Sequence, residues 1–135
     1  MTFEELNSVR KLKKQLADEN KKLEVLDIVI ESFPHKYGKV NGGGGTSAKL
    51  PTSPFEGFAT LKVDTEKKIE NLQKQLRETI PKLTALIQEN FTDTTEQSLL
   101  IYRYVACKRF KDISFLLGYS EQWIYKKHRE ILKSL

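Results

Sequence analysis

The stretch Leu116–Leu132, "LLGYSEQWIYKKHREIL", decides the fold because it contains the signals of a helix end, a turn and a new helix. Gly118 follows two leucines and suits the left-handed conformation that commonly ends a helix. Ser120 is a favoured N-cap residue, and Glu121 then lies at the positive end of the following helix. We therefore predict a short helix over 110–117, a turn, and a longer helix toward the C-terminus.

The apolar residues of this region have the spacing of helices that pack together. The side chains expected to face inward are Ile113, Leu116 and Leu117 on the short helix, and Ile124, Ile131, Leu132 and Leu135 on the longer one. An upstream helix is predicted to begin with a capping box of Thr94 and Gln97. Its inner face is formed by Leu100, Ile101, Tyr104 and Val105. These elements predict a helix-turn-helix domain over 92–135.

The outward face of the last helix carries polar, cationic and aromatic side chains. We predict that it contacts DNA, because the N-terminal residues of a recognition helix reach base edges in the major groove. Gln122 would pair with adenine, and Lys126 or Arg129 with guanine or phosphate. Trp123 or Tyr125 would pack on a thymine methyl group or a sugar. The candidate DNA-binding residues of this helix are Ser120, Gln122, Trp123, Tyr125, Lys126, Lys127, Arg129 and Lys133. Further candidates, for phosphate contacts, are Lys108, Arg109 and Lys111.

Each of these features has a second interpretation. A charged helix face is often only solvated, and Trp123 is equally well explained by packing inside the domain. His128 is more often a half-buried histidine with a satisfied hydrogen bond than a ligand or a base, and Cys107 suits a small core position. The helix would also suit a protein partner such as RNA polymerase.

The distribution of charge supports a polyanionic partner. The chain has 135 residues and a net charge of +5. Residues 95–135 contain eight Lys or Arg and four Asp or Glu, a net charge of +4. The excess therefore lies mainly in the predicted helix-turn-helix domain, although such an excess does not prove that nucleic acid is bound.

The rest of the chain predicts two long helices separated by a linker. Residues 1–32 have an apolar seam with alternating steps of three and four, interrupted at Glu19. Residues 60–91 have a similar seam, and Pro81 is expected to kink this helix or to start a new one near Ile80. Between them, residues 33–59 are rich in Gly and Pro and predict a linker. The fold class is therefore all-α: a long N-terminal helical hairpin or coiled coil, followed by the helix-turn-helix. The seams also allow a homodimer through the long helices.

Several classes of protein are not expected. Asn41–Lys49, "NGGGGTSAK", lacks the glycine before and the hydroxyl residue after the lysine that a phosphate-binding loop needs. Two histidines and one cysteine do not suffice for a structural zinc site, and no nucleophile and base have a recognisable spacing. We therefore expect no enzyme, no metal and no cofactor. No apolar run approaches the roughly 20 residues of a membrane-spanning helix, and the single cysteine fits a reducing cytoplasm.

Residues 94–135 resemble region four of bacterial sigma factors, and more closely the small phage regulators of the ArpU/RinA type. The residues that carry the resemblance are Tyr102, Tyr104, Ile113, Leu116–Ser120, Ile124, Tyr125, His128 and Leu132. One departure is Phe110–Asp112, where relatives tend to carry an acidic pair. The resemblance implies a sequence-specific transcriptional regulator that activates phage late genes in the cytoplasm of a bacterial host cell.

Two other functions remain open at the level of sequence. Small-terminase proteins, which package DNA, also join a helix-turn-helix to helical segments that oligomerise, but they assemble as rings. A protein-interaction module that acts on RNA polymerase would use the same aromatic and cationic helix without binding DNA. The mass in solution and the binding of duplex DNA at low salt separate these functions from a regulator.

Overall fold

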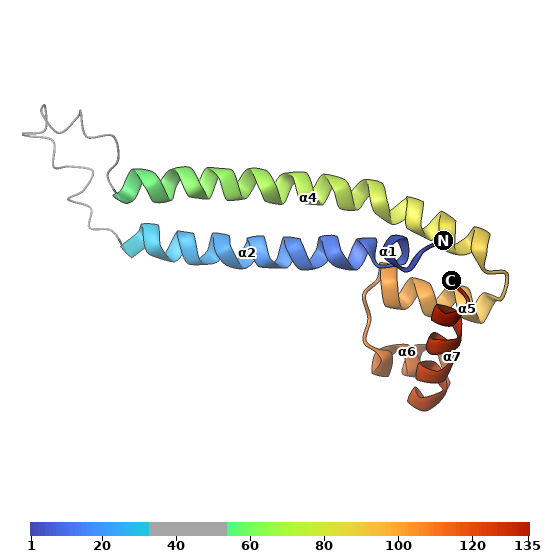
Figure 1. Cartoon of the computed structure of the whole chain (residues 1–135). Helices are drawn as coiled ribbons and strands as arrows, with labels where there is room; N and C mark the ends of the chain where they lie inside the picture. Colours follow the sequence, from blue (N-terminus) through green and yellow to red (C-terminus); the bar gives the residue numbers. More distant parts are fainter. Residues whose placement is uncertain (33–53) are drawn as a thin grey trace, which may run out of the picture. The chain divides into compact units, whose positions relative to one another are not determined.

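The computed structural model describes residues 1–32 and 54–135, and all regular structure in these ranges is helical. Figure 1 shows the helices, which are α1 (Phe3–Leu6), α2 (Ser8–Ser32), α4 (Pro54–Asn90), α5 (Thr94–Leu100), the π-helical segment η2 (Ile101–Val105), α6 (Phe110–Leu117) and α7 (Glu121–Lys133). The all-α prediction is thus confirmed for these ranges. None of the helices found there is long and apolar enough to cross a membrane.

The chain divides into two compact units. Unit 1 combines Met1–Lys14 with Lys74–Leu135, and unit 2 spans Gln15–Gln73. The start of α2 and the end of α4 therefore belong with the C-terminal helices, whereas the remaining parts of α2 and α4 form a separate pair.

The N-terminal segment folds as two helices, so the prediction of one long helix within 1–32 is wrong at its start. Thr2 caps α1 through a capping box: its hydroxyl accepts a hydrogen bond from the Glu5 backbone N–H at 3.2 Å, and the Glu5 carboxylate accepts one from the Thr2 N–H at 3.1 Å. Asn7 leaves the helical conformation at φ −88° and ψ 4° and ends α1. Val9, in the first turn of α2, is fully buried in unit 1.

In unit 2, residues 15–32 of α2 and 54–73 of α4 lie side by side in opposite directions (Figure 1). Near one end, Lys62 Nζ lies 2.8 Å from Asp27 Oδ1. Farther along the pair, a shallow cavity is lined by residues of both helices. These residues are Gln15, Glu19, Lys68, Asn71 and Leu72. The ion pair and the cavity lining show that the two helices are antiparallel.

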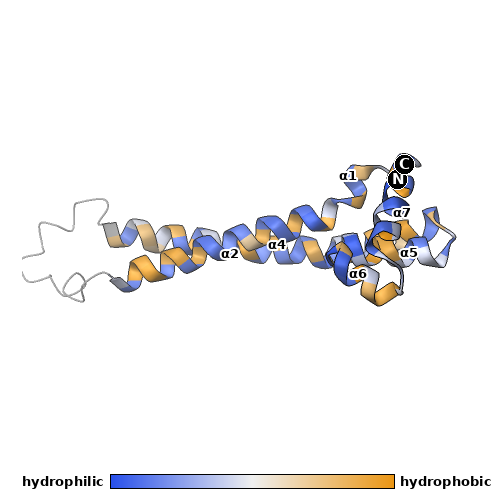
Figure 2. Cartoon of the chain, turned by 90° about the horizontal axis from the view of Figure 1, so that it is seen from below, coloured by the Kyte–Doolittle hydropathy of each residue, from blue (hydrophilic) through white to orange (hydrophobic). Residues whose placement is uncertain are grey.

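The interior of unit 2 follows the predicted seams only in part. Figure 2 shows hydrophobic and hydrophilic residues alternating along both helices, as expected for amphipathic helices. Leu26 and Ile69 are buried, and the polar residue Thr65 is buried as well. The Thr65 hydroxyl donates to the Leu61 carbonyl oxygen at 2.8 Å, so a polar group is buried without loss of a hydrogen bond.

Helix α4 begins earlier than the sequence indicates and is continuous. The predicted linker over 33–59 is wrong for residues 54–59, which form the first turns of α4. Residues 33–53 of that linker lie outside the described ranges. Of the two alternatives predicted for Pro81, the new helix near Ile80 is not found, because a single helix continues through Pro81. The proline removes one backbone donor, but it is exposed, so water can replace the lost hydrogen bond.

Unit 1 encloses a core to which α1, α2 and the C-terminal helices all contribute. Its fully buried side chains are Leu6, Val9, Leu83, Ile87, Leu99, Leu100, Tyr104, Ile113 and Ile124. Since these residues come from both ends of the chain, the C-terminal helices share one core with the N-terminal segment. This shared core fixes the position of α7 within unit 1.

The start of α5 differs from the predicted capping box. Asp93 is the N-cap, and its carboxylate accepts a hydrogen bond from the Thr95 N–H at 3.2 Å. The Gln97 side-chain amide donates instead to the Phe91 carbonyl oxygen. Asp is as good an N-cap as Thr, and in this position its carboxylate reaches the first turn of the helix.

The segment after α5 changes from α-helix to π-helix and then reverses. The Ala106 N–H donates to the Ile101 carbonyl oxygen at 2.9 Å, five residues back. Cys107 then has φ 57°, a left-handed conformation that is uncommon for residues other than glycine. It is half-buried, so the expected small core position is only partly correct. The chain turns here and enters α6 at Phe110.

Candidate nucleic-acid interface

Helices α6 and α7 are joined by the three-residue turn that the sequence predicts. Gly118 has φ 78° and ψ 22°, the left-handed conformation, and its N–H donates to the Ser114 carbonyl oxygen at 2.9 Å. The Ser114 hydroxyl donates to the Tyr119 carbonyl oxygen across the same turn. The Ser120 hydroxyl accepts from the Trp123 N–H at 3.1 Å and caps α7. The local sequence therefore ends α6, closes the turn and starts α7.

The predicted inner faces of α6 and α7 are correct at five of their seven positions. Those that are buried or half-buried are Ile113, Leu117, Ile124, Ile131 and Leu132. The inward position predicted for Leu116 is wrong. This residue is 49% exposed, on the flank of a helix of only two turns. The inward position predicted for Leu135 is also wrong, because this residue is 39% exposed. Helix α7 ends at Lys133, so the helical period no longer applies to Leu135.

His128 fixes the inner side of α7 against η2. Its Nε2 lies 2.6 Å from the Tyr104 hydroxyl oxygen, and its ring also packs against Phe110. Burial, and then the charges of Arg103 and Arg10, lower the pKa of His128 from 6.5 to about 4. Burial also raises the pKa of Tyr104. At neutral pH the imidazole is therefore neutral and shares a hydrogen bond with the Tyr104 hydroxyl.

The outer side of α7 carries a row of polar and cationic side chains. Its exposed members are Gln122, Lys126, Arg129 and Lys133, spaced by four, three and four residues. Positions with this spacing lie on one side of a helix. Across residues 1–32 and 54–135, no carboxylate forms an ion pair with this row. The row therefore offers one amide and three cations to solvent.

Lys127 and Ser120 have structural partners within unit 1. Lys127 Nζ lies 3.1 Å from Glu96 Oε1 of α5, and about a quarter of each side chain is exposed. The hydrogen bond to Glu96, the largest cause, raises the pKa of Lys127. This lysine thus joins α7 to α5 rather than extending the outer row. The Ser120 hydroxyl is exposed but is already used in the helix cap.

The two candidate aromatic residues lie in different surroundings. Trp123 is half-buried and stacks on Tyr119, with ring centroids 4.0 Å apart and an interplanar angle of 15°. Tyr125 is exposed, and its ring centroid lies 4.6 Å from that of Phe110. The packing interpretation thus accounts for part of Trp123, whereas Tyr125 is 47% exposed beside the outer row.

The three basic candidates near α6 are all exposed. Lys108 precedes the helix, Arg109 is its N-cap residue, and Lys111 lies in its first turn. Arg109 Nε also lies 3.4 Å from Asp112 Oδ2. Lys108 and Lys111 remain without an ion pair within the part of the chain that the structure describes.

Two groups of surface residues were missed by the sequence analysis. Phe115 is 88% exposed and lies near exposed Leu116 and Tyr119. Phe115 lies between the inward-facing positions Ile113 and Leu117 of α6, and this spacing could have predicted that its side chain points outward. Arg10 and Lys13 contact the η2 region from α2. No sequence pattern relates residues so far apart in the chain.

The chain was compared with known proteins by family, by sequence and by structure. No family model matches it, and no similar curated protein or solved structure was found.

Proposed function

We propose that the protein is a sequence-specific DNA-binding regulator of transcription, in which α6, the turn and α7 act as a helix-turn-helix. The single observation that carries this proposal is the row of Gln122, Lys126, Arg129 and Lys133 on a helix whose opposite side is anchored in the core of unit 1. Three cations without an ion pair in the described ranges, on a helix anchored in a core, are suited to a polyanion, and a helix is the element that fits the major groove.

The proposed contacts follow from position along α7. Gln122 lies in the first turn, where side chains reach base edges, and its amide can form two hydrogen bonds with adenine. Lys126 and Arg129 follow on the same side and suit guanine or phosphate. Lys133, in the last turn, and Lys108 before α6 suit backbone phosphates, which orient the protein on the duplex. Tyr125 and Trp123 would make the apolar contacts.

The biological assignment rests on the resemblance of residues 94–135 to sigma region four and to the ArpU/RinA type of phage regulator. On that basis we assign the protein to activation of phage late genes. We also propose that the paired parts of α2 and α4 form a helical hairpin of the coiled-coil type, through which two copies associate as a dimer. A dimer would suit paired half-sites in DNA.

A protein-interaction function on RNA polymerase is the second candidate. The observation that favours it is the exposed apolar group of Phe115, Leu116 and Tyr119, because contiguous exposed apolar residues often mark protein contacts. This function requires no binding to duplex DNA, which is what separates it from the first proposal.

Selection of bound duplexes from a random pool tests the proposal directly. The wild-type protein should enrich a defined sequence. The double variant Lys126→Ala/Arg129→Ala should lower the affinity for that sequence about thirtyfold or more, since each good base contact contributes about 1–3 kcal/mol. The control is Lys67→Ala/Lys68→Ala in unit 2, which removes the same charge. Enrichment of no sequence, or equal affinities of the two variants, would refute the proposal.

A further inference from the structure

The first turns of α2 concentrate positive charge within unit 1. Arg10, Lys11, Lys13 and Lys14 follow one another within five residues, and no acidic residue occurs from Leu6 to Ala17. Residues three and four apart are neighbours on a helix surface, so Arg10, Lys13 and Lys14 share one side of α2. This group was not part of the candidate interface, which contains residues of the C-terminal domain only.

Two of these cations reach the segment between α5 and α6. Lys13 Nζ donates to the Val105 carbonyl oxygen at 2.9 Å. The Arg10 guanidinium lies 5.9 Å from the centroid of the Tyr104 ring. The start of α2 is therefore in direct contact with η2, which leads to the basic residues that precede α6.

Arg103 adds a cation at the same place, and the backbone of Lys108 lies beside it. Arg103 Nη1 donates to the Lys108 carbonyl oxygen at 3.1 Å. Burial, and then the charge of Arg10, lower the pKa of Arg103, which shows that the two guanidinium groups are close enough to repel each other. We call Arg10, Lys13, Lys14, Arg103 and Lys108 the cationic cluster.

The cationic cluster has no counter-charge in the described ranges. No carboxylate of residues 1–32 or 54–135 lies within ion-pair distance of its members. In addition, Arg103 Nε is buried without a hydrogen-bond partner in the same ranges. Like charges held together repel one another and destabilise the fold, and a bound anion would remove this repulsion.

Direct contacts connect the cationic cluster to the outer surface of α7. The Arg103 guanidinium lies 4.1 Å from the centroid of the Phe110 ring, and that ring lies 4.6 Å from the ring of Tyr125. Tyr125 and Arg129 are four residues apart on α7 and share one side. Ring contacts through Phe110 therefore link Tyr125, beside the outer row of α7, to Arg103 of the cationic cluster.

The geometry points to a second DNA contact: the cationic cluster binds backbone phosphates of the duplex that α7 reads. This inference rests on the proposed function. Duplex DNA is the partner that fits, because its phosphates repeat at short intervals along the strand and can engage two cationic sites of one protein. The cluster would position the protein without reading sequence.

The test uses the full chain and a fluorescent random-sequence duplex of about three helical turns, or about 30 bp. Arg10→Gln/Lys14→Gln removes two cations of the cluster that lie on α2, outside the interface proposed for α7. We expect its Kd at about 100 mM salt to rise about tenfold, and the slope of log K against log salt to fall by about two. Arg10→Gln serves as a second variant and should lower the slope by about one.

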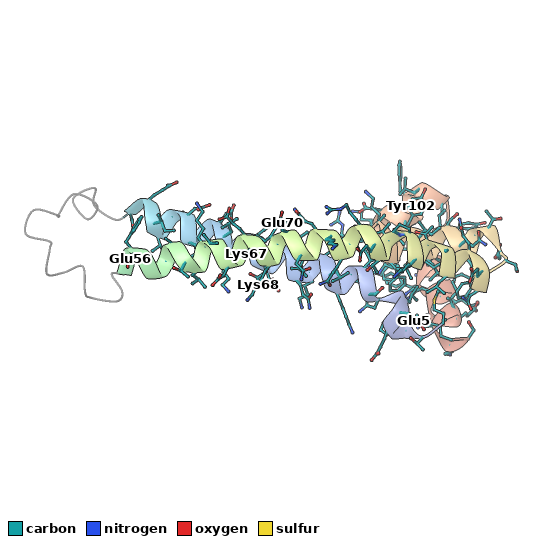
Figure 3. All side chains as sticks on the ribbon, turned by 90° about the horizontal axis from the view of Figure 1, so that it is seen from above. Glu5, Glu56, Lys67, Lys68, Glu70 and Tyr102 are labelled. Atoms are coloured by element: carbon teal, nitrogen blue, oxygen red, sulfur yellow. The ribbon has the colours of Figure 1, made fainter. Side chains whose placement is uncertain are left out.

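The matched control is Lys67→Gln/Lys68→Gln, in unit 2. These side chains are labelled on α4 in Figure 3 and are exposed beside Glu66 and Glu70, so their charges are locally balanced. The control should keep the wild-type Kd and slope. The cluster variants should also leave unchanged the ratio of affinities for selected and random duplexes, whereas Lys126→Ala/Arg129→Ala should lower that ratio.

The outcomes separate this inference from the proposed function. If the wild type binds the duplex, but the cluster variants have the Kd and slope of the control, the cluster is not a phosphate site and α7 can still bind DNA. If the wild type binds no duplex at low salt, the proposed function fails, and this inference fails with it. Circular dichroism of each variant verifies that its helices are intact.

Discussion

Unit 1 and unit 2 enclose apolar side chains to different extents. In unit 1, helices from both ends of the chain surround Leu99, Ile113 and Ile124, which are fully buried. In unit 2, Val25 and Ile28 remain 59% and 66% exposed, because two helices enclose only the stripe between them. A core shared by several helices can hold α7 rigidly, whereas a helix pair leaves apolar flanks for further contacts. These flanks favour the proposed dimer.

The largest expected effect concerns the core of unit 1. Ile124→Ala should lower the free energy of unfolding by about 3–5 kcal/mol, because it empties a fully enclosed site. Leu26→Ala in unit 2 should cost about 2–3 kcal/mol, because the site is less enclosed. Urea unfolding can be followed by the fluorescence of Trp123, the only tryptophan, and by circular dichroism of all helices.

The two signals test whether the units are distinct in stability. Trp123 lies on α7 in unit 1, so its transition should shift in Ile124→Ala and stay near that of the wild type in Leu26→Ala. Circular dichroism should shift in both variants. Coincident fluorescence and dichroism transitions in Leu26→Ala would show instead that the chain unfolds as one cooperative unit.

A smaller effect is expected from the pH dependence of unit 1. The unfolded chain protonates His128 near pH 6.5, but the folded chain does so only near its pKa of about 4. Protons therefore bind preferentially to the unfolded state between these values, and the stability of unit 1 falls as the pH decreases from 6.5 toward 4. We expect a loss of about 1–2 kcal/mol, allowing for partial solvent screening.

Comparison with His128→Gln isolates this contribution from the titration of carboxylates. Urea midpoints of Trp123 fluorescence should fall more steeply in the wild type than in the variant between about pH 7 and about pH 4. Equal pH dependence of the two proteins would contradict the buried, neutral state of His128. The contacts of His128 with Tyr104 and Phe110 all lie in unit 1. Leu26→Ala in unit 2 should therefore leave the pH dependence of the Trp123 fluorescence midpoint unchanged.

The smallest effect is expected in unit 2 and should be stabilising. Glu19 interrupts the seam of α2, and its Oε2 is buried without a hydrogen-bond partner in the described ranges. Glu19→Leu should raise the stability of unit 2 by about 1 kcal/mol, because it removes an unsatisfied polar atom. The control is Glu24→Leu at an exposed position of the same helix. If both variants raise the urea midpoint of the dichroism signal equally, the gain comes from added hydrophobicity and not from removal of the unsatisfied Glu19 atom.

The sequence predicts the region from α6 to α7 well because its signals are local. The helix over 110–117, the left-handed Gly118 and the Ser120 cap are all confirmed. The failures of prediction occur where a distant residue or the end of an element decides the outcome. Leu116 is exposed because α6 is short, and the start of α5 is capped by Asp93 in place of Thr94.

In the candidate interface, too, local spacing predicts some features, and packing between distant segments decides the others. Helical spacing alone places Lys126, Arg129 and Lys133 on the outer side of α7, as the structure has them. Spacing cannot show that Lys127 pairs with Glu96, because that contact depends on the packing of α5 against α7. Nor can it show that Trp123 stacks on Tyr119.

By itself, the sequence determined the helical class, the turn between α6 and α7, and the cationic side of α7, because capping, glycine conformation and helical period act within a few residues. Only the tertiary structure decided that the start of α2 joins the C-terminal helices. That arrangement brings Arg10 to Tyr104 and Lys13 to Val105, and it holds half-buried His128 in its neutral form. Such contacts depend on the packing of distant segments into one core, where burial and neighbouring charge set the properties of each group.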